Sequence, residues 1–471
     1  MEYYDIFIRK IYLNIIIMET SYIIILIIFI LIISLNSEKI KIWILNRILV
    51  LRGILAPNCF WYKISDLVLD DGSGINLYNK YKKKYGDFSL TYMFNKKIYI
   101  VTNNKHIKTI LDNSPTIFGV GDLKYKFFKS FMKKNVGVSN CPFIKKKNGC
   151  PWKYRRQINE IALNTNKLHI YAHKYNINIK KSILKWKNKI KFEYNDFMTF
   201  GKLLTSQVVF NTNKIHPDVF NIFNEANSIN VFNGKFQISQ DSYNNYIKIL
   251  KYYIKNPVNK SLIKLLVKET NNQEELIHQI PHFIFPMVGL FVTTIPRLLV
   301  LLFNHKTVLN KIINEINSIE NNENITNKIY ELSYLRKCIL ETVRLNNPVI
   351  TTFRTLLSDF SFNKKYNFKK GTQFLILNNP VLRENEFFKK PNQFIPSRWT
   401  KKMEKSYYAI SFSQGPQQCP GKELAIYLAQ SFIYNFIKIK KINKNTIVKT
   451  NYINKNYIPQ IINPCEIKIQ L

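Results

Sequence analysis

Cys419 lies in the pattern that most constrains what this chain can fold into. The segment Phe412-Ser-Gln-Gly415-Pro-Gln-Gln-Cys419-Pro-Gly421 has the spacing F-x-x-G-x-x-x-C-x-G, and a helix-forming stretch begins at Lys422. Backbone N–H groups in a tight loop help to keep a cysteine sulfur deprotonated, and the thiolate is the form that binds a metal. The pattern therefore predicts a loop that holds a haem iron through Cys419. The alternative is a buried structural cysteine beside the start of a helix.

The other fixed positions of this loop have separate expected roles. Gly415 permits a turn with positive φ that folds the loop under the haem ring. Gly421 has no Cβ, so the helix that follows can approach the porphyrin closely. Phe412 supplies an apolar wall that limits solvent at the sulfur, and Pro420 suits the first turn of the following helix.

Two segments upstream carry charged residues at defined spacing. Glu341-Thr-Val-Arg344 places an acid and a base three residues apart in a stretch whose apolar residues recur at helical spacing, so the two side chains can pair. On its own, such an E-x-x-R pair is equally an ordinary solvated helix pair. Further along, Pro391-Asn-Gln-Phe394-Ile-Pro396-Ser-Arg398-Trp399 has the spacing P-x-x-F-x-P-x-R-W.

In this order, the three motifs resemble those of the cytochrome P450 family. The resemblance implies a mainly α fold with a small β portion, and a haem b (iron protoporphyrin IX) with Cys419 as the axial ligand of its iron. It also implies that Arg398 joins Glu341 and Arg344 in a buried charge triad, which suits the several donors of a guanidinium. Because burial of charge costs desolvation, we expect the triad to lock the cysteine loop rather than to raise stability.

The same resemblance suggests which residues hold the haem propionates. Gly149-Cys-Pro-Trp152-Lys-Tyr-Arg155-Arg156 is similar to the family's W-x-x-x-R helix, with Trp152 and Arg156 on one face of a helix that starts near Pro151. Arg354, ten residues after Arg344, occupies the position of the second propionate arginine, and charge-assisted bonds suit such anchors. The family often carries a basic residue two positions before the cysteine, where this chain has Gln417, which can donate without charge.

The oxygen-binding helix departs most from the family pattern. Aligning the two threonines with [A/G]-G-x-[D/E]-T-T makes Thr293 and Thr294 the catalytic hydroxyl residues and puts Val292 where an acid is usual. A hydroxyl beside dioxygen helps to deliver protons, and the neighbouring acid feeds them, which Val292 cannot do. Pro296 removes the N–H that would bond the carbonyl of Val292, so we expect this carbonyl to be free and the helix to be kinked.

The N-terminus holds a long apolar segment. Residues 15–35 form an apolar run that contains a single charge, Glu19, and is long enough for a membrane-spanning helix. Basic residues are more frequent after this run than before it, which places the remainder of the chain in the cytoplasm. We therefore expect residues 1–38 to form an N-terminal segment with a membrane anchor, and residues 39–471 to form the haem-thiolate catalytic domain. Initiation at Met18 would give a more conventional anchor, and a cleaved signal peptide is the rival reading.

The net charge and the positions of the cysteines limit which partners and metals the chain is expected to bind. The net charge is +40, but the excess is spread over the chain and no nucleic-acid module is recognisable, so we predict a solvated basic surface and no nucleic-acid partner. A basic face around Lys422 would suit an acidic electron-donor protein. The six cysteines include no C-x-x-C pair, which disfavours a zinc site. No G-x-G-x-x-G or P-loop is present, so electrons would have to come from a partner reductase.

Taken with the resemblance, these features predict a membrane-bound monooxygenase that hydroxylates an apolar, lipid- or sterol-like substrate with dioxygen. Phe291, Val292 and the stretch Val349-Ile350-Thr351 are expected to line an apolar pocket. A haem-thiolate isomerase or lyase that rearranges hydroperoxides without reductant is the first rival, and Val292 keeps it open. The second rival is a degenerate haem-binding protein with no catalytic activity.

Overall fold

The computed structural model describes residues 75–93, 96–121, 151–228, 238–319, 324–349, 351–451, 462 and 464–471. The predicted anchor at 15–35, the alternative start at Met18, and the residues Cys59, Cys141, Cys150 and Ile350 lie outside these ranges. The domain boundary expected near residue 38 lies outside them as well, so the anchor and the boundary stay predictions.

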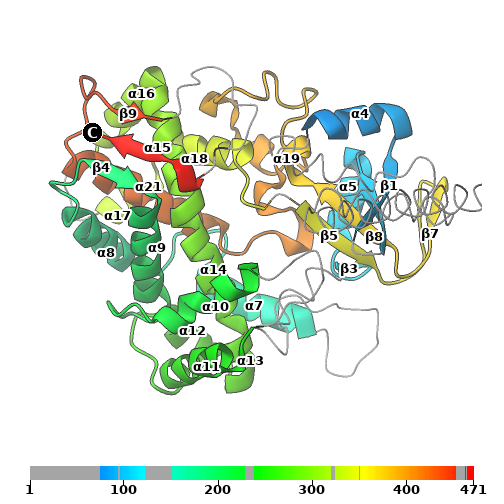
Figure 1. Ribbon diagram of the computed structural model, residues 1–471, viewed down its shortest axis with the longest axis horizontal. Coiled ribbons are helices and arrows are strands. Elements are labelled where there is room, and N and C mark those ends of the chain that lie inside the picture. Colours follow the sequence, from blue (N-terminus) through cyan, green and yellow to red (C-terminus); the bar gives the residue numbers. More distant parts are fainter. Residues whose placement is uncertain are drawn as a thin grey trace, which may run out of the picture.

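Helices make up most of the described chain (Figure 1). Their bounds are α4 (Ile75–Tyr85), α5 (Asn104–Asp112), α7 (Pro151–Leu163), α8 (Ala172–Leu184), α9 (Tyr194–Val209), α10 (Pro217–Ser228), α11 (Gln240–Lys255), α12 (Leu262–Glu269), α13 (Gln273–Gln279), α14 (Pro281–Gly289), α15 (Ile295–Asn304), α16 (Lys306–Asn317), α17 (Ile325–Tyr330), α18 (Ser333–Leu345), α19 (Asn378–Val381), α20 (Lys401–Glu404) and α21 (Lys422–Ile439).

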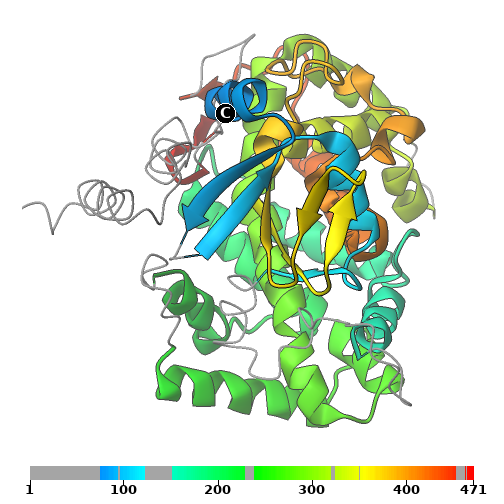
Figure 2. The same cartoon turned by 90° about the vertical axis from the view of Figure 1, so that its right-hand side faces the viewer.

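The strands are short and gather mainly on one side of the molecule (Figure 2). They are β1 (Phe88–Met93), β2 (Lys96–Val101), β3 (Phe118–Val120), β4 (Lys191–Glu193), β5 (Thr351–Leu356), β6 (Phe360–Phe362), β7 (Tyr366–Phe368), β8 (Gln373–Leu377), β9 (Lys449–Thr450) and β10 (Lys468–Gln470). The largest sheet of the described residues has the order β1-β2-β8-β5-β3, in which only β2 and β8 run parallel.

Two apolar cores correspond to these two regions. The larger core lies among the helices and includes Phe200, Phe291 and Phe432, while the smaller one lies under the sheet and includes Phe118 and Phe374. Figure 1 shows the helical region on the left and the sheet, with α4 and α5, on the right. The expected mainly α architecture with a small β portion is therefore confirmed for the described chain.

A long apolar stretch, Gln273–Asn304, runs through the helical region as α13, α14, a π-helical turn (Leu290–Thr294) and α15. Within the described chain it alone has the length and composition to cross a membrane, and 67% of its most apolar window is buried inside the molecule. A helix that is apolar on most sides is also what a protein core requires. Its burial and its ring contacts with α9 and α21 are those of a core helix.

Candidate haem-thiolate site

The loop that carries Cys419 is closed by its own backbone. The Cys419 N–H donates to the Phe412 carbonyl over 2.8 Å, and the Gln418 N–H donates to the Gly415 carbonyl over 2.9 Å. Gly415 has φ of +71°, and a Cβ there would lie 2.7 Å from the Leu111 carbonyl oxygen. Both the backbone conformation and this close approach require glycine, so the positive φ expected at Gly415 is observed.

Three groups offset the cost of burying a charged sulfur at Cys419. Burial raises the pKa of the Cys419 thiol, whereas the Gly421 backbone N–H, Arg156 and Lys422 lower it, and the net shift is upward. A backbone donor and two cations near the sulfur are what a metal-bound thiolate needs, while the burial keeps the uncomplexed sulfur protonated. The donor set therefore fits a thiolate that forms when a metal binds.

The remaining motif positions surround this loop. Phe412 is half-buried, packs against the helical core, and has the Lys422 ammonium 5.9 Å from its ring centre. Gln417 is half-buried at the end of the 3₁₀ turn Gly415–Gln417. A Cβ at Gly421 would lie 3.7 Å from Leu163 Cδ1, an ordinary contact distance. Protein neighbours therefore do not require glycine at position 421, and its close approach to a porphyrin stays a prediction.

Gln414, to which the sequence analysis gave no role, fastens the cysteine loop to the preceding segment. Its buried side-chain amide donates to the carbonyls of Glu404, Ser406 and Ala409 over 3.0, 3.1 and 3.3 Å. From the other side, the Thr165 hydroxyl donates to the Pro420 carbonyl over 2.8 Å. The position of Gln414 between Phe412 and Gly415 was the available signal, but its carbonyl partners could not be read from spacing.

The structure brings the three residues of the expected charge triad together. Arg344 Nε donates to Glu341 Oε2 over 2.9 Å and its Nη2 donates to Oε1 over 2.8 Å, while Arg398 Nε donates to Oε1 over 3.0 Å. Burial raises the pKa of Glu341, but Arg344, Arg398 and the Ile395 N–H hold it below its ordinary value. Glu341 is thus a buried carboxylate that is fully paired with donors.

Trp399, the last residue of the quoted P-x-x-F-x-P-x-R-W segment, adds a further donor. Its indole N–H donates to Glu341 Oε2 over 2.9 Å, and the Ile395 N–H donates to Oε1 over 3.0 Å. The Arg344 guanidinium also lies 4.9 Å from the centre of the Phe388 ring and donates to the Leu382 carbonyl. The cluster therefore ties α18 to the segment that leads to the cysteine loop.

Arg354 is a buried cation whose hydrogen bonds are to neutral groups. It lies on β5, where Nε donates to the Ser114 hydroxyl over 3.0 Å and Nη1 to the Phe353 carbonyl over 2.8 Å. Within the described residues no carboxylate pairs with it, and burial alone lowers its pKa to about 10. A buried guanidinium without a counter-charge fits the carboxylate of a bound anionic cofactor.

The W-x-x-x-R residues lie on α7, which begins at Pro151 as expected. Trp152 and Arg156 are both half-buried. Arg156 pairs with Glu160 over 2.6 Å and is close enough to lower the pKa of Cys419. The structure therefore pairs Arg156 with Glu160 on α7, and contact of Trp152 or Arg156 with a propionate stays a prediction.

A π-helical turn, which the sequence did not predict, precedes Pro296, and the free Val292 carbonyl and the kink expected there stay predictions. At its end, the Ile295 N–H donates to the Leu290 carbonyl, five residues earlier, and the helix continues as α15. The Thr293 hydroxyl donates to the Gly289 carbonyl over 2.7 Å, which leaves its lone pairs free to accept. Thr293 is half-buried and Thr294 is buried, so Thr293 is the more accessible hydroxyl.

The prediction that Phe291 lines a substrate pocket is wrong. Its fully buried ring lies 5.3 Å from that of Phe200 on α9 and 6.1 Å from that of Phe432 on α21, so it faces the helical core. Val292 is also buried. The accessible positions of this segment are Gly289, Leu290 and Thr293, because the π-helical turn changes which residues share a face.

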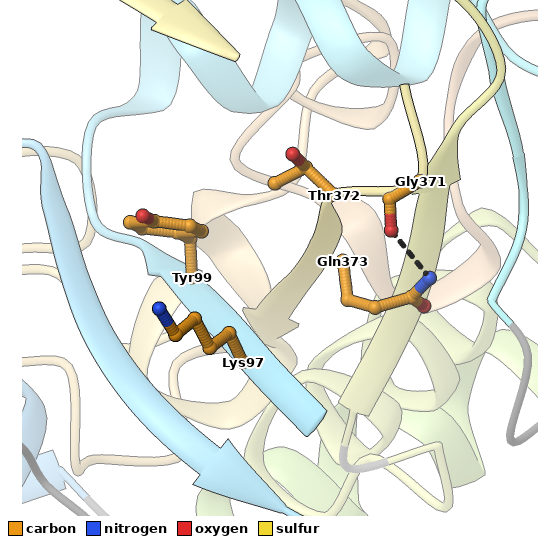
Figure 3. Close-up of a pocket in the computed structure, with 5 residues that line it drawn as sticks. All are labelled: Lys97, Tyr99, Gly371, Thr372 and Gln373. Atoms are coloured by element: carbon orange, nitrogen blue, oxygen red, sulfur yellow. Dashed lines mark hydrogen bonds between the residues drawn. The ribbon is translucent and has the colours of Figure 1, made fainter. Parts of the chain in front are cut away.

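A hollow lies on the surface of the sheet. Figure 3 shows its lining by Lys97 and Tyr99 of β2 and by Gly371, Thr372 and Gln373 at the start of β8. Its polar groups bond within the protein: Gln373 Nε2 donates to the Gly371 carbonyl over 3.1 Å, and the Thr372 hydroxyl donates to the Lys369 carbonyl. No predicted site residue lines this hollow.

The closed cysteine loop and the buried Arg354, with which no carboxylate of the described residues pairs, on a mainly helical fold fit a haem-thiolate protein. The family model described as Cytochrome P450 matches residues 158–439, more than half of the chain, and the chain belongs to this family. Its cofactor is therefore haem with a cysteine thiolate ligand.

Solved structures share this fold. The retinoic acid-bound cyanobacterial CYP120A1 has a TM-score of 0.66 at 16% identity, over 83% of this chain and 93% of that one. P450BioI, solved with an acyl carrier protein ligated to hexadec-9Z-enoic acid, has a TM-score of 0.62 at 14% identity, over 86% of this chain and 100% of that one. At these identities the likeness shows the fold alone.

Curated relatives match over shorter stretches. A (21S)-21-acetyl-1-hydroxy-apo-melianone synthase from Melia azedarach is 34% identical over 107 residues, which are 23% of this chain and 22% of the relative. A beta-amyrin 28-monooxygenase from Solanum lycopersicum is 34% identical over 116 residues, 25% of this chain and 24% of the relative. The chain thus spans about a quarter of the length of the curated relatives it matches.

Proposed function

We propose that this protein is a monooxygenase that hydroxylates an apolar, lipid- or sterol-like substrate. The reaction would consume one dioxygen, two electrons and two protons, and would yield the hydroxylated product and water. The observation that carries this proposal is the Cys419 loop, closed on itself and surrounded by Arg156, Lys422 and the Gly421 N–H. A thiolate ligand favours cleavage of the O–O bond, and this cleavage is required to activate dioxygen.

In this proposal the thiolate of Cys419 would hold the haem iron, and Trp152, Arg156 and Arg354 would hold the haem propionates. When bound, the haem supplies the chemistry that activates dioxygen for attack on a C–H bond. Thr293 holds a proton at its hydroxyl, whose lone pairs can accept a hydrogen bond while it donates to Gly289. Gly415 and Gln414 keep the loop shape that aims the sulfur.

The substrate class is supported by the relatives and by the accessible helix face. Two relatives are named as beta-amyrin 28-monooxygenases and one as a beta-amyrin 11-oxidase, all acting on a large apolar molecule. In this chain Gly289 and Leu290 are the apolar accessible neighbours of Thr293. An apolar substrate suits such a lining.

The partner and the location follow from the same proposal. Electrons would come from a partner reductase, and the apolar run at residues 15–35 would anchor the protein in a membrane with the catalytic domain facing the cytoplasm. An apolar substrate partitions into the same membrane, which raises its concentration near the enzyme. We expect no nucleic-acid partner.

The test is turnover of β-amyrin under ¹⁸O₂ in vesicles that hold the full-length protein with or without a cytochrome P450 reductase and NADPH. We expect a product with one heavy oxygen atom, formed only with the reductase and absent with Cys419→Ala. A haem-loaded protein that oxidises neither β-amyrin nor other apolar lipids with the reductase present would contradict the proposal and favour the degenerate haem-binding alternative.

A second candidate is a reductant-independent isomerase or lyase acting on lipid hydroperoxides. Val292, buried where an acid is usual, favours it because no carboxylate feeds protons to Thr293 from that position. Turnover of a fatty-acid hydroperoxide without NADPH supports this candidate. Under the monooxygenase proposal, hydroperoxide consumption without reductant stays at the level of free haem.

A further inference from the structure

Four charged side chains form a second ion cluster beside the cysteine loop, here called the Arg336 cluster: Arg336, Glu404, Lys422 and Glu423. Arg336 bonds both carboxylates through both oxygens of each, with Nη2 at 2.8 Å from Glu404 Oε2 and Nη1 at 2.8 Å from Glu423 Oε2. Lys422 Nζ lies 3.0 Å from Glu404 Oε2. The cluster holds two positive and two negative charges and is balanced.

The Arg336 cluster is largely shielded from water. The exposed fractions of its side chains are 22% for Arg336, 17% for Glu404, 14% for Lys422 and 11% for Glu423. The Tyr330 hydroxyl also donates to Glu423 over 3.1 Å. Lys422 is thus a paired, mostly buried cation, and the basic face expected around it for an electron donor stays a prediction.

The cluster reaches the cysteine loop through Lys422. Lys422 is the first residue of α21, three positions after Cys419, and its ammonium lies against the Phe412 ring. A cavity of about 10 Å³, large enough for at most one water, is lined by both Glu404 and Lys422 and by the loop residues Phe412, Gln414 and Gln418. Gln414 donates to the Glu404 carbonyl, so the loop and the cluster share a backbone attachment.

We propose that Lys422 is a positioning residue that fixes a positive charge at the cysteine loop, and that the carboxylate of Glu404 offsets this charge. This inference rests on the proposed assignment of Cys419 as the haem ligand. Of the cluster, Lys422 is the member whose ammonium reaches the loop, at the ring of Phe412, whose carbonyl accepts from the Cys419 N–H, and Glu404 pairs with this ammonium. A fixed cation at the cysteine loop would favour the reduced state of a haem held there, because attraction is stronger in a site shielded from water.

The charges of Lys422 and Glu404 have opposite signs, which permits a signed test. Lys422→Gln removes the cation, so we expect the reduction potential of the full-length holoprotein to become more negative. Glu404→Gln removes the anion and leaves the cation, so we expect a more positive potential. Lys422→Arg keeps the charge and should restore the wild-type potential. Lys438→Gln, an exposed lysine on the last turn of α21, is the matched control and should change nothing.

The second readout is the half-life of the red-shifted ferrous–CO band in mild urea. Both Lys422→Gln and Glu404→Gln should shorten this half-life about threefold or more, as expected for loss of a partly buried ion pair. A merely structural cluster would move both potentials in the same direction or not at all, and either result overturns the inference. If Lys422→Gln does not take up haem, the sign for Glu404→Gln decides. Absence of the red-shifted band in the wild type would instead refute the assignment of Cys419.

Discussion

Two ion clusters flank the cysteine loop, and both include residues of α18, yet they differ in burial and in balance. Glu341 accepts hydrogen bonds from two arginines, one indole and one backbone N–H, and both Glu341 and Arg344 are fully buried. In the Arg336 cluster, one arginine bridges two carboxylates that a lysine and a tyrosine also contact, and each member keeps some exposure.

The difference in burial indicates which property of the protein each cluster controls. A fully buried carboxylate has no access to water, so it depends on every donor around it, and its loss or the loss of a partner is costly. A partly exposed network can be rescued by solvent, so it contributes less to stability. We therefore assign the Glu341 cluster to the integrity of the fold and the Arg336 cluster to the electrostatics of the cysteine loop.

The largest expected effect comes from breaking the buried cluster. Arg344→Met leaves the Glu341 carboxylate with a missing counter-charge in a site without water, and we expect a loss of about 3–5 kcal/mol in the free energy of unfolding. Urea unfolding followed by circular dichroism measures it. A loss under about 1 kcal/mol would mean that the cluster is not needed for the fold.

The next effect concerns Arg354 and has opposite signs in the two forms of the protein. Because Arg354 is buried and no carboxylate of the described residues pairs with it, Arg354→Met should stabilise the haem-free protein by about 1–3 kcal/mol. The same change should speed transfer of haem to an acceptor protein about tenfold, because a charge-assisted bond to a propionate is lost. Unfolding of the haem-free form and a haem-transfer assay measure the two effects. Unchanged haem retention would remove Arg354 from the proposed propionate anchors.

A smaller effect is expected in the Arg336 cluster. Arg336→Gln keeps a hydrogen-bonding side chain but leaves Glu404 and Glu423 close together, and we expect a loss of about 1–2 kcal/mol, less than for Arg344→Met. The same urea titration measures it. An equal loss for the two variants would end the distinction between the clusters.

The smallest effect is expected at an exposed pair on the sheet. Lys369 and Asp359 lie 2.8 Å apart with most of their surface in water, so Lys369→Met should leave the free energy of unfolding unchanged within error. This variant sets the baseline for the other three. A measurable loss there would show that proximity of charges, rather than burial, governs stability in this protein.

The features that could be predicted from the sequence are those that depend on the spacing of nearby residues. The Glu341–Arg344 pair, the start of α7 at Pro151 and the positive φ at Gly415 depend on neighbours a few residues apart. The Arg336–Glu423 contact joins residues 87 positions apart, and no pattern in the chain indicates it. The orientation of Phe291 was mispredicted because Phe291 itself lies within a π-helical turn, in which the residues that share a face differ from those of an α-helix.

The central claim is that Cys419 binds the haem iron as a thiolate, and the ferrous–CO difference spectrum tests it most directly. We expect a strongly red-shifted Soret band for the full-length protein and loss of that band, with the fold retained, for Cys419→Ala. A haem-loaded wild type with an unshifted band, or a red-shifted band that persists in Cys419→Ala, would contradict the account.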